Sequence, residues 1–208
     1  MLHLRSICIS FMVFVSVGCS TPNISKSYTG PERPINEVAV YSPNNRGDFN
    51  GPSILTTHLN GKILREYFSE IPFGPYISMV PGDVEVRVTF DDYEDVFLWV
   101  IAPNVVSLKT KNFKGHYDIK FNAKPGKFYA PIFNYNLPQE KRILEMCISE
   151  LNMGSSLAET RVPQKYVACG KPSIPAIESN IKICAEIYKI NEPPKLYDEM
   201  CREVIKLK

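Results

Sequence analysis

Two hydrophobic periods follow one another along the chain. From about residue 37, apolar and polar residues alternate with the period of two that is typical of β-strands. The clearest case is the run 84–90, where three valines and a phenylalanine alternate with glutamate, arginine and threonine. This pattern predicts a strand with one buried face and one solvent-exposed face. After Leu137 the apolar residues recur at spacings of three and four, which predicts helices.

Turn signals divide the first part into short strands. We predict strands within residues 37–41, 54–68, 77–90, 96–101 and 117–133. Asn-Gly at 60–61 is typical of a type I′ hairpin turn, and Pro-Gly at 81–82 and at 125–126 marks two further turns. About eight short strands without helices between them favour a mainly β fold, an antiparallel β-sandwich over residues 35–137.

The last third of the chain predicts a helical segment over residues 138–208. A helix is expected over 138–151, and a loop is expected over 152–172, which contain glycine and proline. Two more helices are expected on either side of residues 191–194, because Pro-Pro prevents one continuous helix. The apolar residues that support these two helices are Ile177, Ile181, Cys184 and Tyr188, then Leu196, Met200 and Val204.

The first 18 residues are expected to form a signal peptide. Arg5 precedes an apolar run over residues 7–17, which has the length of a signal-peptide core and is too short to span a bilayer. The run ends in "VGC" at 17–19, a pattern that resembles the lipobox of bacterial lipoproteins, with Ser16 where that family usually has an apolar residue. The resemblance implies cleavage before Cys19 and lipid attachment to its sulfur. The alternative is an ordinary secretory signal that is cut beyond Cys19.

The lipoprotein resemblance also implies a cellular location. Two or three acyl chains hold a protein firmly on a membrane, so the membrane is an expected partner. Ser20 follows the lipid-bearing cysteine, which by analogy with the family implies delivery to the outer membrane, on the periplasmic side rather than the cell surface. Residues 19–34 are polar, contain three prolines and lack apolar periodicity, so we expect a flexible tether.

The charge balance excludes one class of partner. Cleavage before Cys19 leaves 208 − 18 = 190 residues, and the mature side chains carry (24 − 1) − 22 = +1. Such a balance does not favour a polyanion, so nucleic acid is not an expected partner.

Four cysteines remain after the leader and the lipid site are set aside. An even number of cysteines in an exported chain indicates disulfides. Cys184 and Cys201 each lie seven residues from the turn between the two predicted helices, so they are level in an antiparallel pair and we predict that they are bonded. This leaves Cys147 with Cys169. A zinc site is the alternative, although the region has no C-x-x-C pair and no histidine.

A second resemblance concerns the strands. The runs "NEVAVY", "NGK", "MVPGDVEVRVTF" and "FNAKPGKFYAPIF" within residues 36–135 resemble the small β-sandwiches of bacterial surface lipoproteins, including PEGA-like modules. The resemblance implies a fold and carries no catalytic residues.

No cluster in the sequence predicts catalysis, a metal or a cofactor. The acidic run "DDYED" at 91–95 lacks the spacing of a calcium loop, so a solvated loop is the alternative to calcium binding. Residues 179–182 match the S-x-x-K pattern of penicillin-binding enzymes, but the companion motifs of that set are absent. His58 and His116 stand in no metal-binding pattern and are expected on the surface or beside turns.

These observations predict a lipid-anchored envelope protein with a non-catalytic binding or assembly role, for which another envelope protein and a cell-wall glycan are the two candidate partners. One alternative is a glycan- or peptidoglycan-binding module, in which loop aromatics such as Tyr93, or an exposed Trp99, stack on sugar rings. A core position between two sheets is the other interpretation of Trp99. A further alternative is a hydrolase whose site is assembled from residues distant in sequence.

Overall fold

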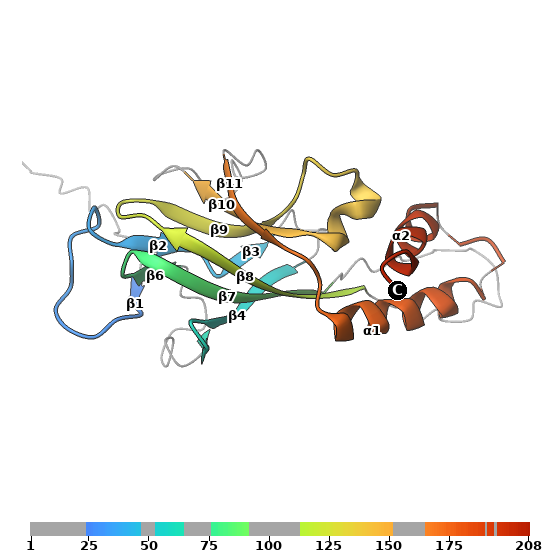
Figure 1. Ribbon diagram of the computed structural model, residues 1–208, viewed down its shortest axis with the longest axis horizontal. Coiled ribbons are helices and arrows are strands. Elements are labelled where there is room, and N and C mark those ends of the chain that lie inside the picture. The colour runs from blue at the N-terminus through green and yellow to red at the C-terminus, as the bar shows by residue number, and fades with distance from the viewer. Residues whose placement is uncertain are drawn as a thin grey trace, which may run out of the picture.

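The structure, a computed structural model, describes residues 24–46, 53–64, 76–91, 113–151, 165–189, 191–193 and 195–208. The predicted leader, Cys19, Tyr93, Trp99 and the strand expected at 96–101 lie outside these residues. The described chain is elongated, with the strands at one end and a helix pair at the other (Figure 1).

Six strands form the first sheet, in which two neighbouring pairs are parallel. Because β1 pairs with β6 and β2 with β9 in parallel, the prediction of a wholly antiparallel arrangement is wrong for these pairs. The chain enters the other sheet between these strands, so the two members of each pair are not joined by a hairpin. In spatial order the strands are β1 (Ile24–Lys26), β6 (Tyr76–Met79), β2 (Ala39–Tyr41), β9 (Phe128–Phe133), β10 (Met146–Leu151) and β11 (Lys165–Gly170).

The second sheet is antiparallel throughout its described pairs. The predicted alternation is present along β7 and β8: every second residue of β8 is buried, and its other side chains are exposed. The order is β3 (Asn44–Arg46), β4 (Ser53–Leu59), β7 (Gly82–Asp91) and β8 (Lys114–Ala123), with β5 (Lys62–Ile63) paired to β4.

One of the three predicted turns closes a hairpin within a sheet, and the other two connect one sheet to the other. Asn60 and Gly61 both have positive φ, 49° and 77°, and join β4 to β5 in a hairpin as expected. Gly82 and Gly126 also have positive φ, but their Pro-Gly turns carry the chain from one sheet to the other. The residues of a turn determine its local conformation, whereas the partner of the next strand depends on packing farther away.

Three expectations about the ends of the β region differ from the structure. A short 3₁₀ helix, η2 (Gln139–Leu144), and the strand β10 replace the helix predicted over 138–151, and β11 lies within the predicted loop 152–172. β10 pairs with β9 on one side and β11 on the other, and this pairing outweighs its local helical spacing. The predicted tether is also shorter than expected, because β1 lies inside residues 19–34.

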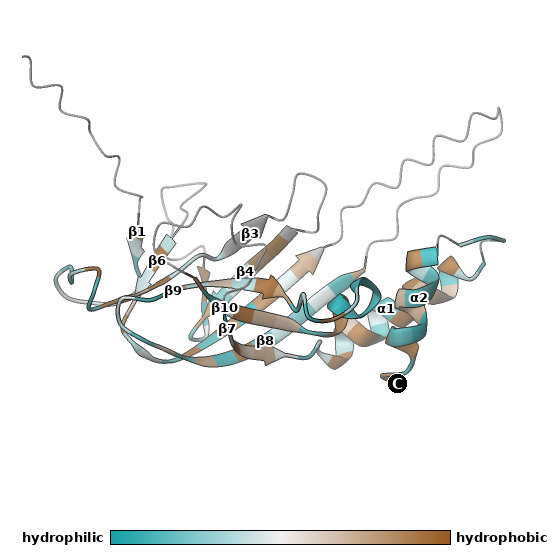
Figure 2. Cartoon of the chain, turned by 90° about the horizontal axis from the view of Figure 1, so that it is seen from above, coloured by the Kyte–Doolittle hydropathy of each residue, from teal (hydrophilic) through white to brown (hydrophobic). Residues whose placement is uncertain are grey.

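The predicted helix pair is present, and a disulfide joins its two helices as expected. α1 (Ile174–Ile187) begins with Pro175 in its first turn, and α2 (Lys195–Ile205) begins after the proline pair. Cys184 of α1 is bonded to Cys201 of α2, and Cys147 of β10 to Cys169 of β11, which are the predicted pairs. Both helices carry hydrophobic and hydrophilic residues along their length (Figure 2), and the buried residues recur at spacings of three and four, as in amphipathic helices.

One hydrophobic core joins the sheets and the helices. Buried residues of both sheets, of η2 and of both helices form a single cluster. The Tyr41 hydroxyl of the first sheet lies 2.6 Å from the Thr56 hydroxyl of the second, and burial raises the pKa of Tyr41 above its usual range. Tyr117 of β8 donates a 2.5 Å hydrogen bond to the carbonyl of Ile143 in η2. The helical segment therefore packs on the β region.

Candidate binding groove

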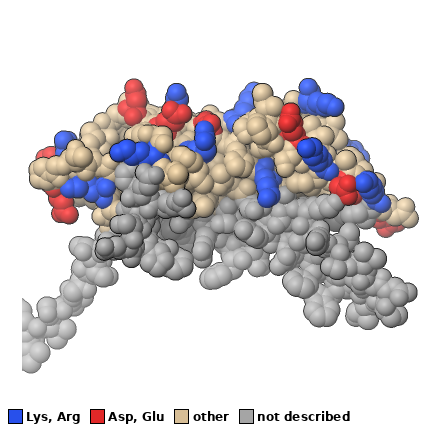
Figure 3. All heavy atoms as spheres, turned by 90° about the horizontal axis from the view of Figure 1, so that it is seen from below, with Lys and Arg blue, Asp and Glu red and all other residues tan. Residues whose placement is uncertain are grey.

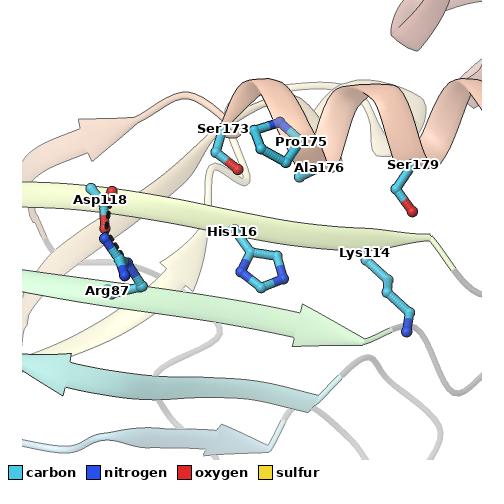
Figure 4. A pocket seen from close by; sticks show the side chains of 8 residues that line it. All are labelled: Arg87, Lys114, His116, Asp118, Ser173, Pro175, Ala176 and Ser179. Atoms are coloured by element: carbon cyan, nitrogen blue, oxygen red, sulfur yellow. Dashed lines mark hydrogen bonds and ion pairs between the residues drawn. The ribbon is translucent and has the colours of Figure 1, made fainter. Parts of the chain in front are cut away.

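A groove lies between the outward face of β7 and β8 and the start of α1. It encloses about 330 Å³ and is open on one side. Figure 4 shows its walls: the strands supply the charged side chains, and the helix supplies two hydroxyls and two small apolar residues. The lining residues are Arg87, Lys114, His116 and Asp118 from the strands, and Ser173, Pro175, Ala176 and Ser179 from the helix side.

Backbone hydrogen bonds hold the helix against the strand. β8 ends its sheet among the described strands, so its outer N–H and C=O groups need partners. The buried side chain of Asn180 accepts from the N–H of Lys114 at 2.9 Å and donates to its carbonyl at 2.8 Å. The N–H of Ser173 donates to the carbonyl of His116 at 2.8 Å. These three bonds fix both walls of the groove.

A charged pair closes one end of the groove. Arg87 Nε donates to Asp118 Oδ1 at 2.7 Å, and a second guanidinium nitrogen donates to Oδ2 at 3.2 Å. The hydrogen bond to Asp118 raises the pKa of Arg87 above its usual value. Both carboxylate oxygens and the guanidinium fork are therefore occupied by each other.

The same sheet face carries two further cross-strand contacts. Lys120 Nζ lies 3.5 Å from a Glu85 oxygen, and Asn122 donates to Asp83 at 2.9 Å. Both contacts join β7 to β8 in register with the Arg87–Asp118 pair. In this part of the face, the charged and polar side chains of β7 pair with those of β8. The groove differs because several of its polar side chains have no such partner among the described residues.

Four polar side chains of the groove make no hydrogen bond or ion pair with another described residue. They are those of Lys114, His116, Ser173 and Ser179. In the strand register Lys114 lies opposite Asp91 and His116 opposite Thr89. The free donors face a common space, so the arrangement is suited to holding a polar ligand.

A serine, a histidine and an aspartate line this groove, yet they do not form a hydrogen-bonded set. Both Asp118 oxygens bond to Arg87, and among the described residues no side-chain hydrogen bond joins the His116 ring to Asp118 or to either serine hydroxyl. A nucleophile needs a base within hydrogen-bond reach, and that base needs an orienting partner. Among the described side chains of the groove, this hydrogen-bonded chain is not formed.

The structure places only some of the residues singled out in the sequence in the groove. Ser179 lies in the groove, but Lys182 of the same S-x-x-K match is not among its lining residues. His58 lies on β4 with Nδ1 3.0 Å from the Thr57 hydroxyl, whereas His116 lines the groove. Sequence reasoning missed the groove, and the one signal available was the series of polar residues at alternate positions of 114–122.

The cysteine region does not offer free thiolates to a metal. Glu145, Cys147 and Cys169 bring three ligand atoms within 4.8 Å of one another. The two sulfurs are bonded to each other, so neither is a thiolate ligand in this state. Within the described residues, no helix is long and apolar enough to cross a bilayer.

Comparisons with known proteins returned no match to a family model, to a curated protein or to a solved structure.

Proposed function

We propose that this chain is a lipid-anchored envelope protein with a non-catalytic binding or assembly role, and that the groove between β7, β8 and α1 is its contact site. One observation carries the binding role: four polar side chains face a shared groove without partners among the described residues, beside a sheet face that is otherwise paired. Preformed concave sites with a few convergent polar groups are the usual form of a ligand site.

The two disulfides support an address outside the cytosol. Such bonds persist in oxidising compartments and are rare in reducing ones. This agrees with the proposed leader and with lipid attachment at Cys19, on the periplasmic side of the outer membrane. In the native host, a Cys19→Ala protein is expected to leave the membrane fraction. Its persistence there would contradict the anchor.

We also propose that the two sheets form a β-sandwich of the kind found in small lipoprotein modules. Support comes from the shared core: Tyr41 and Tyr129 of the first sheet pack on Phe121 of the second, with ring centroids 6.4 and 5.1 Å from it. The alternating burial of β7 and β8 places their apolar side chains on the same inner side.

A hydrolase is the rival function, because Ser179, His116 and Asp118 line one groove. The Arg87–Asp118 pair argues against it, since both Asp118 oxygens are directed to Arg87 and, among the described residues, no hydrogen bond joins Asp118 to the His116 ring that it would have to orient. We expect a panel of ester and peptide substrates to show no turnover above that of the Ser179→Ala protein. Turnover that is lost in Ser179→Ala would replace the binding role with catalysis.

The binding role is tested by photo-crosslinking in cells of the native host. A photoreactive residue at position 179 faces the groove, and one at the exposed position 178, which does not line the groove and lies about 100° around the same helix, serves as the control. We expect a defined adduct from position 179 that position 178 does not give, identified by mass as protein, glycan or lipid. Equal labelling from both positions would exclude the groove as a contact site.

A further inference from the structure

We infer that the groove between β7, β8 and α1 binds a phosphate ester group. The inference rests on the proposed function and specifies its ligand chemistry. Three properties of the groove support this inference: its local charge, the kind of hydrogen-bond donors that line it, and the rigidity of its walls.

The described side chains of the groove carry a positive balance. Two cations, Arg87 and Lys114, face one carboxylate, Asp118, which leaves a net charge of +1. The carboxylate is already matched by Arg87, so the charge of Lys114 is the one that remains. On the molecular face in Figure 3, basic and acidic side chains are interspersed.

The remaining donors suit a tetrahedral anion rather than a planar one. A carboxylate is best recognised by the two parallel N–H groups of an arginine fork, and in Arg87 the fork made by Nε and one terminal nitrogen is already bonded to Asp118. What remains is a lysine ammonium, an imidazole and two hydroxyls, which approach from different directions. Figure 4 shows Ser179 directed from α1 toward β8 and the His116 ring between Lys114 and the Arg87–Asp118 pair. Donors arranged in this way match the several oxygens of a phosphate group.

The walls of the groove are held before any ligand arrives. The Asn180 side chain hydrogen-bonds to both the N–H and the carbonyl of Lys114, and the N–H of Ser173 donates to the carbonyl of His116. The α1 helix is in turn joined to α2 by the Cys184–Cys201 disulfide. A site on rigid elements loses little conformational entropy on binding, which favours affinity for a small group.

The test is a titration of the full-length chain in detergent with glycerol 3-phosphate, followed by the NMR signals of His116 and Ser179. Lys114→Gln removes the groove cation. Lys120→Gln is the matched control, because it removes the same charge from the same face of β8 outside the groove. An Asp91→Asn protein removes one negative charge from the residue that pairs with Lys114 in the strand register. Acetate replaces the phosphate ester as the planar anion.

We expect saturable shifts with glycerol 3-phosphate that Lys114→Gln weakens at least about tenfold, as the loss of a hydrogen bond to a charged group predicts. Lys120→Gln is expected to change the affinity less than twofold, and Asp91→Asn to strengthen it. No saturable shift, equal weakening by both lysine substitutions, or equal affinity for acetate would each overturn the inference.

A second arm identifies the source of the phosphate. Phosphatidylcholine vesicles with and without one tenth phosphatidic acid are compared for protection of the same signals. If the vesicles with phosphatidic acid protect these signals more than the soluble ester does, and Lys114→Gln abolishes that protection, the ligand is a lipid headgroup. Protection by the soluble ester alone assigns a free phosphorylated molecule. A crosslink at position 179 together with no phosphate binding would leave the proposed function standing and remove only this inference.

Discussion

At the scale of single residues, one amide connects the helices to the strands. Asn180 is 3% exposed and satisfies both the N–H and the C=O of Lys114, so it takes the place of a neighbouring strand at this edge. Nothing in its local sequence marks this role, because an asparagine within a helix is ordinarily neutral or unfavourable.

Replacing Asn180 by alanine is expected to destabilise the protein by about 2 kcal/mol, since two backbone groups lose their buried partner. Lys182→Ala, an exposed change on the same helix, is expected to stay within about 0.5 kcal/mol of the parent. Urea unfolding of the three proteins measures the difference. Equal stability of the two variants would mean that Asn180 does not hold α1 to β8.

A second residue makes stability depend on pH. Glu150 of β10 is mostly buried and lies 2.9 Å from Lys127 Nζ, and the hydrogen bond from Lys127 holds the pKa of Glu150 below its usual value. A carboxyl whose pKa is lower in the folded state stabilises the fold above its unfolded pKa, about 4.3 for glutamate. That contribution is lost as the pH falls through the folded value.

Glu150→Gln is therefore expected to flatten the acid side of the stability profile. Between neutral pH and the region below about 4.3, the parent protein loses more unfolding free energy than this variant. Glu32→Gln, at an exposed position, is the control and is expected to follow the parent. Chemical unfolding at a series of pH values provides the measurement, and parallel curves for the parent and Glu150→Gln would contradict the assignment.

At the scale of elements, the two disulfides have different surroundings. Cys184 and Cys201 are both fully buried between α1 and α2, whereas Cys169 is exposed on β11 and only its partner Cys147 is buried. They close loops of 17 and 22 residues, so the chain-entropy model assigns each about 3 kcal/mol. Their similar loop lengths leave access to a reductant as the main difference.

We expect the bond between Cys147 and Cys169 to be reduced first in the native state. Cys169 is the exposed residue of its pair, so a thiolate has access to this bond, whereas it reaches the bond between the helices only after local opening. Differential alkylation followed by mass spectrometry during dithiothreitol treatment orders the two events. The same measurement in denaturant is the control, where both bonds are expected to be reduced together.

At the scale of the whole molecule, the two sheets approach each other along β8 and β11. Gly170 of β11 lies so close to β8 that an added Cβ would stand 2.8 Å from Ile119 Cγ1 and 3.1 Å from the Asp118 carbonyl oxygen. This approach brings the end of β11 beside the groove, just before the chain enters α1. A small residue at this position therefore supports both the closure of the sheets and the position of the helix.

Gly170→Ala is expected to cost about 1–3 kcal/mol, because the methyl group meets strand backbone that does not yield easily. Lys171→Ala, at the adjacent exposed position, is expected to have little effect. Thermal unfolding compares the two proteins, and amide exchange of β8 reports whether the edge loosens. An unchanged melting temperature for Gly170→Ala would show that the sheets do not meet this closely.

The sequence by itself determined those features whose cause is local or periodic. The alternation over 84–90 defines a strand with one buried face whatever its neighbours are, and Asn60-Gly61 specifies its hairpin through φ values that few residues adopt. The helix pair and the Cys184–Cys201 bond follow from apolar spacing and a central proline pair, because helix geometry converts spacing into position.

Only the tertiary structure decided which strands are neighbours. Residues 146–151 have helical spacing, yet they form the strand β10 because β9 and β11 supply hydrogen bonds on both sides. The groove depends on the same kind of long-range choice: Lys114 and Ser179 are 65 positions apart and meet because Asn180 binds an edge that the sequence does not mark. Periodicity encodes the face of an element, whereas its partner is selected by the free energy of the whole packed core.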